Sequence, residues 1–97
     1  MLEVEWTSPA LKDLRGIEQF LERERSPEYA VRLLTAIRSR AHWLIDFPRG
    51  GRPFLNETRI LRVLETPYLI RYRVLEEAKR VQVLRVHHER QDWSIVS

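Results

Sequence analysis

The chain has 97 residues, of which 43% are hydrophobic and 32% are charged, and it holds only 3 glycines and 5 prolines. This composition is typical of a globular protein and excludes the disordered and fibrous classes, and the length predicts a single domain over residues 1–97. Because the sequence has no cysteine, it excludes disulfides, a thiolate nucleophile and cysteine-bound metal.

The formal net charge of +3 is unevenly distributed along the chain. Residues 1–48 carry 7 basic and 8 acidic side chains, whereas residues 49–97 carry 10 basic and 6 acidic ones. Fifteen of the 17 basic residues are arginine, whose planar guanidinium suits paired hydrogen bonds to carboxylate or phosphate. The C-terminal half therefore predicts contact with a nucleic acid, a phosphate-bearing complex or an acidic protein segment.

The N-terminus lacks the pattern of a secretory signal. Glu3 and Glu5 lie where a signal peptide has basic residues before an apolar run. No stretch approaches the roughly 20 apolar residues of a membrane span. We expect a cytoplasmic protein with no membrane partner.

The first half of the chain predicts one strand followed by two helices. The alternating stretch "LEVEW" at residues 2–6 is typical of a half-buried strand. Thr7 or Ser8 can cap a helix whose first turn tolerates Pro9, and Asp13 falls on the solvent side of that helix. Its predicted apolar stripe consists of Leu11, Leu14, Ile17 and Leu21.

A second helix begins with the same pair of residue types, since Ser26 can cap it and Pro27 can open it. The short connection predicts an antiparallel pair with the first helix. The stretch "DFPRGGRPF" at residues 46–54 ends the helical half, because its prolines and glycines cannot continue a helix. The predicted apolar stripe of the second helix consists of Ala30, Leu33 or Leu34, Ile37, Ala41 and Leu44.

The second half predicts three strands in a meander. They are "RILRVLE" at residues 59–65, "YLIRYRVL" at residues 68–75 and "RVQVLRVHH" at residues 80–88. On the middle strand one face packs on the helices, and the other face points arginines outward. The packed face holds Tyr68, Ile70, Tyr72 and Val74, and the other face holds Leu69, Arg71, Arg73 and Leu75.

Period-two alternation on the last strand places Arg85 on the same face as Val81, Val83 and His87. Arg85 is then partly shielded from solvent. A shielded arginine usually requires an acidic partner, so we expect one for Arg85.

The predicted order is strand, helix, helix, strand, strand, strand. This is an α+β domain in which a helical hairpin packs on one face of a mostly antiparallel four-stranded sheet. Binding or chemistry is expected on the uncovered face of the sheet or at its C-terminal edge.

The stretch "RVHHERQDW" at residues 85–93 has the most chemically active side chains of the sequence. His87 and His88 are adjacent, so on a strand they point to opposite faces and cannot share one metal ion without a bulge. No second cluster has ligand spacing, and no serine or threonine lies in a strand-turn-helix elbow. We therefore expect no metal site, no cofactor and no hydrolytic triad.

Metal-free RNA cleavage stays open on residue types alone. It needs a base, an acid and cations around the phosphate. The residues of suitable types are Arg71, Arg73, Arg85, His87 or His88, Arg90 and Glu89. Arginines that alternate with apolar residues are equally typical of an ordinary solvated sheet face.

Four runs taken together resemble a known superfamily. "VEWTSPALKDLRGIEQFL", "FPRGGRP", "TRILRVLETPYLIRYRV" and "VQVLRVHHERQDW" are similar, in order and over nearly the whole chain, to the RelE/ParE toxins of bacterial type II toxin-antitoxin systems. The resemblance implies the fold above and a small antitoxin that neutralises the protein by wrapping it. It also implies one of two activities: the RelE-like branch cleaves mRNA in the ribosomal A site, whereas the ParE-like branch is not a ribonuclease and poisons DNA gyrase.

Three features favour the ParE-like branch. RelE-like ribonucleases have a catalytic arginine after the aromatic residue that starts the middle strand, where this chain has Leu69 after Tyr68. The chain also continues past the last strand with Glu89 and Asp92, whose charges would repel RNA. A histidine at the position of His88 resembles the last strand of the ParE-like branch.

The resemblance therefore predicts a ParE-like toxin that poisons DNA gyrase and has no catalytic residues. One alternative is a RelE-like mRNA interferase in which Arg71, Arg85 and His88 do the phosphate and proton chemistry. Another is an inactive toxin fold that acts only as an interaction partner of the antitoxin, and direct nucleic-acid binding stays open. The residues expected to contact gyrase or acidic parts of the antitoxin are Arg71, Arg73, Arg85, Arg90 and Trp93.

Overall fold

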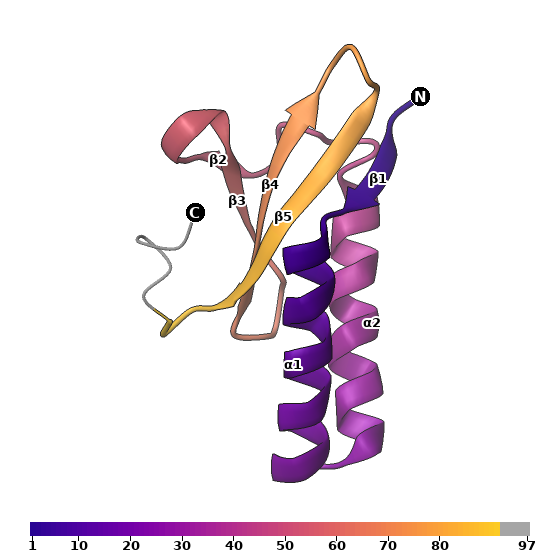
Figure 1. Ribbon diagram of the computed structural model, residues 1–97, viewed down its shortest axis with the longest axis vertical. Helices are drawn as coiled ribbons and strands as arrows, with labels where there is room; N and C mark the ends of the chain where they lie inside the picture. The colour runs from indigo at the N-terminus through magenta and orange to yellow at the C-terminus, as the bar shows by residue number, and fades with distance from the viewer. Residues whose placement is uncertain (92–97) are drawn as a thin grey trace.

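The computed structural model describes residues 1–91, in which a helical hairpin packs beside a mixed sheet (Figure 1). The strand order in the sheet is β1-β5-β4-β3-β2, with β1 parallel to β5 and the other neighbours antiparallel. The elements in chain order are β1 (Glu3–Trp6), α1 (Ser8–Glu24), α2 (Pro27–Trp43), β2 (Arg52–Pro53), the 3-10 turn η1 (Leu55–Glu57), β3 (Arg59–Arg62), β4 (Tyr68–Leu75) and β5 (Arg80–His88).

The expected α+β order is confirmed, with one strand added. The short β2 lies between the helical hairpin and β3 and pairs with Arg59 and Ile60. It comprises only two residues and one of them is proline, so it carries no alternation that a sequence pattern could reveal. The sheet therefore has five strands instead of the expected four.

Both helices begin at the expected capping residues. The Thr7 hydroxyl accepts a hydrogen bond from the backbone N–H of Ala10 at 3.3 Å, and the Ser26 hydroxyl accepts one from that of Tyr29 at 3.1 Å. Each cap satisfies one of the backbone donors that a helix start leaves open. A proline follows within each first turn, as the sequence predicts.

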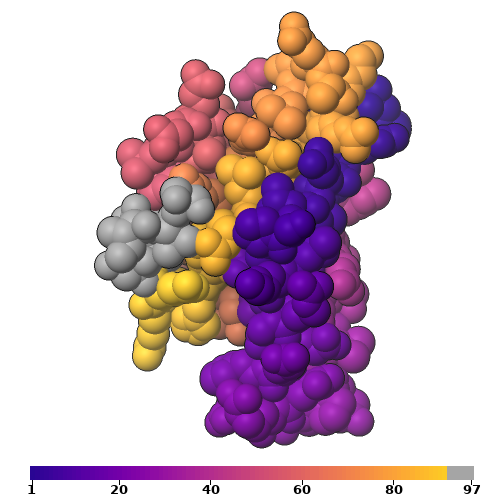
Figure 2. All heavy atoms as spheres, in the orientation of Figure 1, coloured from indigo at the N-terminus to yellow at the C-terminus, as the bar shows by residue number. Residues whose placement is uncertain are grey.

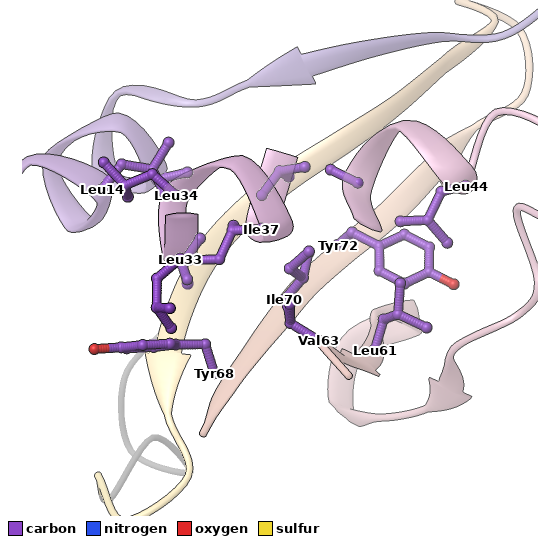
Figure 3. Packing of buried hydrophobic residues seen from close by; sticks show 14 of the residues in the cluster. Leu14, Leu33, Leu34, Ile37, Leu44, Leu61, Val63, Tyr68, Ile70 and Tyr72 are labelled. Carbon is purple, nitrogen blue, oxygen red and sulfur yellow. The ribbon is translucent and has the colours of Figure 1, made fainter. Parts of the chain in front are cut away.

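The core lies between the helices and one face of the sheet (Figure 3). The predicted stripe of α2 is buried in full, and the predicted packed face of β4 supplies Tyr68, Ile70 and Tyr72. On α1 the expectation is wrong for Leu11, which is exposed, because the helix presents Ala10 to the sheet instead. A small residue there lets α1 approach the strands closely.

The connection between α2 and β3 is held by one tyrosine. The Tyr72 hydroxyl donates to the carbonyl of Pro48 at 2.8 Å and accepts from the backbone N–H of Gly51 at 2.9 Å. Gly51 packs so closely that an added Cβ would lie 2.7 Å from the Tyr72 ring and 2.8 Å from the carbonyl oxygen of Ile60. The glycine at this position is therefore a packing requirement.

A β-bulge in β5 changes which residues share a face. Arg71 pairs with Arg85 but Tyr72 pairs with Val83, so Leu84 is an extra residue on β5. Beyond the bulge the alternation is shifted by one position. The expected grouping of Arg85 and His87 with Val81 and Val83 is therefore wrong, since Val86 and His88 continue their face instead.

Within residues 1–91, neither helix has the length and apolar character that crossing a membrane requires.

Candidate functional site

One part of the sheet face directed away from the helices is buried. Leu69, Arg71 and His87 lie together on it, because Leu69 pairs with His87 and Arg71 is the next residue of that face on β4. All three are buried, and Arg71 is only 6% exposed, with its guanidinium carbon 5.3 Å from the centre of the Phe54 ring. The expectation that Arg71 points outward into solvent is wrong, because the segment after β2 brings Phe54 over it.

Arg85 has the acidic partner that the sequence predicts, and it is Asp13 of α1. Arg85 donates to both carboxylate oxygens, from Nε at 2.8 Å and from Nη2 at 3.0 Å. The paired hydrogen bonds raise the pKa of Arg85 above its ordinary value, against the opposing effect of burial. The predicted solvent exposure of Asp13 is wrong, since its side chain is only 16% exposed.

The same carboxylate also accepts a hydrogen bond from the backbone at one edge of the sheet. β1 ends at Trp6, so it leaves the outer edge of β5 without a strand partner beyond Val83 among the described residues. Asp13 accepts the backbone N–H of Val86 at 2.9 Å, and the Thr7 hydroxyl lies 3.0 Å from the carbonyls of Val83 and Leu84. Figure 2 shows α1 packed against β5 along this stretch. Helix α1 thus replaces a strand at this edge.

The other predicted contact residues are dispersed. Arg73 is exposed on β4 and donates from Nε to the Gln82 side chain at 2.7 Å, which in turn donates to Glu5 at 3.1 Å. Arg90 is exposed beyond the opposite end of β5. The structure therefore does not bring the four predicted arginines into one surface cluster. Trp93 lies outside the described residues.

The two histidines lie on opposite faces of the sheet, as expected for neighbours on a strand. His88 makes an edge-to-face contact with Tyr68, with ring centres 5.5 Å apart. It also lines a cavity of about 360 Å³ between α1 and the ends of β4 and β5, together with Ile17, Phe20 and Tyr68. His88 is therefore separated by the sheet from Arg71, with which the nuclease alternative would combine it.

His87 is fully buried on the face opposite to His88. Its pKa is lowered from 6.5 to about 4, mainly by burial; the nearby positive charge of Arg85 adds to the shift, and Asp13 opposes it. The ring is therefore neutral at physiological pH. A neutral buried imidazole is suited to packing, and it is not an acid that could protonate a leaving group near pH 7.

We expect acidification to destabilise the fold through His87. Its folded pKa of about 4 lies below the unfolded value of 6.5, so the unfolded chain binds the extra proton first and stability falls as the pH drops through this window. Between pH 7.5 and pH 5 the loss from this residue is about 2 kcal/mol in the free energy of unfolding. Urea unfolding at both pH values measures it.

The matched pair for this experiment is His87→Leu and His42→Gln. His42 is exposed on α2, so His42→Gln should show the same difference in the free energy of unfolding between pH 7.5 and pH 5 as the parent chain. In His87→Leu this difference should be smaller by about 2 kcal/mol. Equal pH dependence in the two variants would contradict the assignment to His87.

The matches to known proteins cover nearly the whole chain. Residues 4–93 match the family described as the ParE toxin of the type II toxin-antitoxin system parDE. A sequence relative from Sinorhizobium fredii, named "Putative toxin Y4kP", is 33% identical over 91 residues, which is 93% of this chain and 91% of the relative.

Solved structures of toxin-antitoxin systems share the fold. The chromosomal ParDE system from P. aeruginosa includes a chain that is 26% identical, with a TM-score of 0.81 over 91% of this chain and 96% of that one. The RelBE2 complex from Mycobacterium tuberculosis includes a chain that is 27% identical, with a TM-score of 0.67 over 90% and 96%. The E. coli RelBE complex, at 16% identity and a TM-score of 0.60 over 94% and 100%, is similar in fold alone. With the family match spanning the helical hairpin and the sheet, this chain belongs to the ParE toxin family of type II toxin-antitoxin systems.

Proposed function

We propose that this chain inhibits growth by poisoning DNA gyrase and that a cognate antitoxin neutralises it. The observation that carries the proposal is the placement of the residues that RNA cleavage would need. Arg71 is buried beneath Phe54, Arg85 is held by Asp13, and His88 lies on the other side of the sheet. A nuclease has to present its cations, base and acid to one phosphate, and these three side chains share no open surface.

The position after Tyr68 supports the same reading. In RelE-like ribonucleases the resemblance places a catalytic arginine there, and this chain has Leu69, which is buried opposite His87. A leucine can neither neutralise nor protonate a phosphate. The similarity is also higher to the ParDE chain, with a TM-score of 0.81, than to the RelBE2 chain, with 0.67 at nearly equal identity.

The antitoxin partner is proposed from the similar structures, whose titles name toxin-antitoxin systems and complexes. A cationic toxin, with a formal charge of +3, suits an acidic binding segment in such a partner. Gyrase contact is assigned to Arg73 and Arg90, which are the exposed members of the predicted set within residues 1–91.

The decisive experiment is supercoiling of relaxed plasmid by purified gyrase, with this protein titrated in and cleaved DNA trapped by detergent. We expect loss of supercoiling together with accumulation of cleaved DNA, and reversal of both when the antitoxin is added. The double charge reversal Arg73→Glu with Arg90→Glu should raise the concentration for half-inhibition by roughly tenfold or more, because charge complementarity at an interface governs encounter.

Arg15→Glu with Arg32→Glu is the matched control, because it reverses two exposed charges on the helices. Equal inhibition by both double variants would remove Arg73 and Arg90 from the gyrase interface. If gyrase stays fully active at large molar excess while translated message is cut within codons, the RelE-like alternative is correct. If neither target responds, the chain is an inactive toxin fold that only binds the antitoxin.

A further inference from the structure

A second groove lies at the outer edge of β3 and extends to Leu69 of β4. It has a volume of about 430 Å³ and contains three arginines from different elements: Arg40 of α2, Arg52 of β2 and Arg62 of β3. Glu89, just after β5, is the acidic residue among those that line it. With Glu89 in place the described lining has a net charge of +2, so the groove is suited to an anion.

Arg40 is held in position before any ligand arrives. Its Nε donates to the backbone carbonyl of Arg62 at 2.9 Å, and its guanidinium carbon lies 4.4 Å from the centre of the Trp43 ring. Within residues 1–91 no carboxylate lies within ion-pair distance of Arg40 or Arg52. A guanidinium with a fixed plane and open terminal nitrogens loses little entropy when it binds a carboxylate.

The groove already binds one carboxylate, from the chain itself. Both terminal nitrogens of Arg62 donate to Oε1 of Glu89, at 3.0 and 3.2 Å. The two side chains are 56% and 41% exposed, and an ion pair so exposed contributes little to stability. An incoming carboxylate can therefore replace Glu89 on Arg62 at small cost.

The backbone at the groove favours a polypeptide over a nucleic acid. β2 pairs only with Arg59 and Ile60, so on the side away from β4 no strand lies beside Leu61 and Arg62 among the described residues. Val63 donates to Tyr68 on the β4 side, and alternation then points the backbone groups of Arg62 outward. The carbonyl of Arg62 already accepts from Arg40, so its N–H is the group that faces the groove. A carbonyl of an extended peptide can accept from that N–H, whereas a phosphate backbone cannot extend the sheet.

We propose that the β3-edge groove, with Arg40, Arg52 and Arg62, binds an acidic extended segment of a partner protein. The inference rests on the proposed function in one respect, since it takes that partner to be the antitoxin. It assigns the acidic contact to arginines other than those expected from the sequence, of which Arg73 and Arg90 are assigned to gyrase contact instead.

The test measures the dissociation constant of the purified full chain for its cognate antitoxin. Arg40→Gln with Arg52→Gln should weaken binding roughly 30-fold or more, since each lost charge-assisted contact costs about tenfold when fully formed. Arg32→Gln is the matched control, because Arg32 lies on the same helix and over an aromatic ring, Tyr29, but outside the groove. It should change the constant less than twofold.

Two further variants separate binding from folding. Glu89→Gln removes the competing carboxylate and frees Arg62, so it should tighten antitoxin binding by about three- to tenfold, a gain that misfolding cannot produce. Arg40→Lys keeps the charge but not the planar fork, so its affinity should lie between those of the parent and Arg40→Gln.

Several outcomes would overturn the proposal. One is equal affinity in the double variant and Arg32→Gln, and another is a Glu89→Gln variant that binds no tighter than the parent. A third is a double variant that loses binding to a 20-base-pair DNA duplex while its affinity for the antitoxin is unchanged, which would assign the groove to phosphate. In these cases the gyrase assay can still succeed, so the proposed function stands alone. A parent chain that fails to bind the antitoxin at all would overturn both.

Discussion

The substitution Asp13→Ala is expected to lower the free energy of unfolding by about 3 kcal/mol. It removes the acceptor for three hydrogen bonds, two from Arg85 and one from the backbone N–H of Val86. The Arg85 side chain is only 21% exposed, so its charge would remain in a partly desolvated position without a partner. Urea unfolding at pH 7.5 measures the loss.

A solvent-exposed ion pair supplies the control for this prediction. Arg49 and Glu76 lie 3.3 Å apart with side chains 67% and 64% exposed, so Glu76→Gln should cost less than about 1 kcal/mol. In the Asp13→Ala background, Arg85→Met should recover part of the lost free energy of unfolding, because it removes the charge that has no partner there. If Asp13→Ala and Glu76→Gln cost the same, the Asp13 carboxylate is not what holds α1 against β5.

The second large effect is expected at Gly51, where Gly51→Ala should cost about 3 kcal/mol. The new methyl carbon would lie 2.7 Å from the Tyr72 ring and 2.8 Å from the carbonyl oxygen of Ile60, so both the loop and the tyrosine would have to move. That movement would also disturb the hydrogen bonds of Tyr72 with Gly51 and Pro48. Thermal and urea unfolding measure the change.

Gly16 is the matched site for the same chemical change. It lies within α1, and an added Cβ would meet nothing within 4 Å, so Gly16→Ala should raise stability by about 0.5 to 1 kcal/mol through helix propensity. Tyr72→Phe tests the hydrogen bonds separately and should cost about 2 kcal/mol. A Gly51→Ala chain as stable as Gly16→Ala would mean that the loop moves aside freely.

The elements with a sustained repeat were predictable from the sequence. β5 begins and ends at Arg80 and His88 as expected, and the stripe of α2 is buried along its length, because each repeat matches the period of its backbone. The caps were predictable for a local reason too, since Thr7 and Ser26 act on residues only three positions away.

The predictions that were wrong concern structural features that no nearby stretch of sequence indicates. The bulge at Leu84 moves Arg85 and His87 to the opposite face of the sheet from the one expected. A leucine at that position gives no indication in the sequence that an extra residue is inserted. The sequence predicts an acid for Arg85 but not which of its 14 acidic residues supplies it, because Asp13 is 72 positions distant. Arg71 was predicted to be exposed because the alternation of β4 gives only the face of a residue. It does not show that Phe54, from a distant segment, packs over that face.

The parallel pairing of β1 with β5 determines when the sheet can form during synthesis of the chain. Glu3 aligns with Arg80 and Trp6 with Val83, so the first strand has no partner until most of the chain has been made. The helical hairpin can form early from local contacts, but closing the loop between the two ends is slow and comes late. A nascent chain that stops short of β5 lacks the strand that carries Arg85, so the sheet and its contact with α1 are assembled only after β5 has been made.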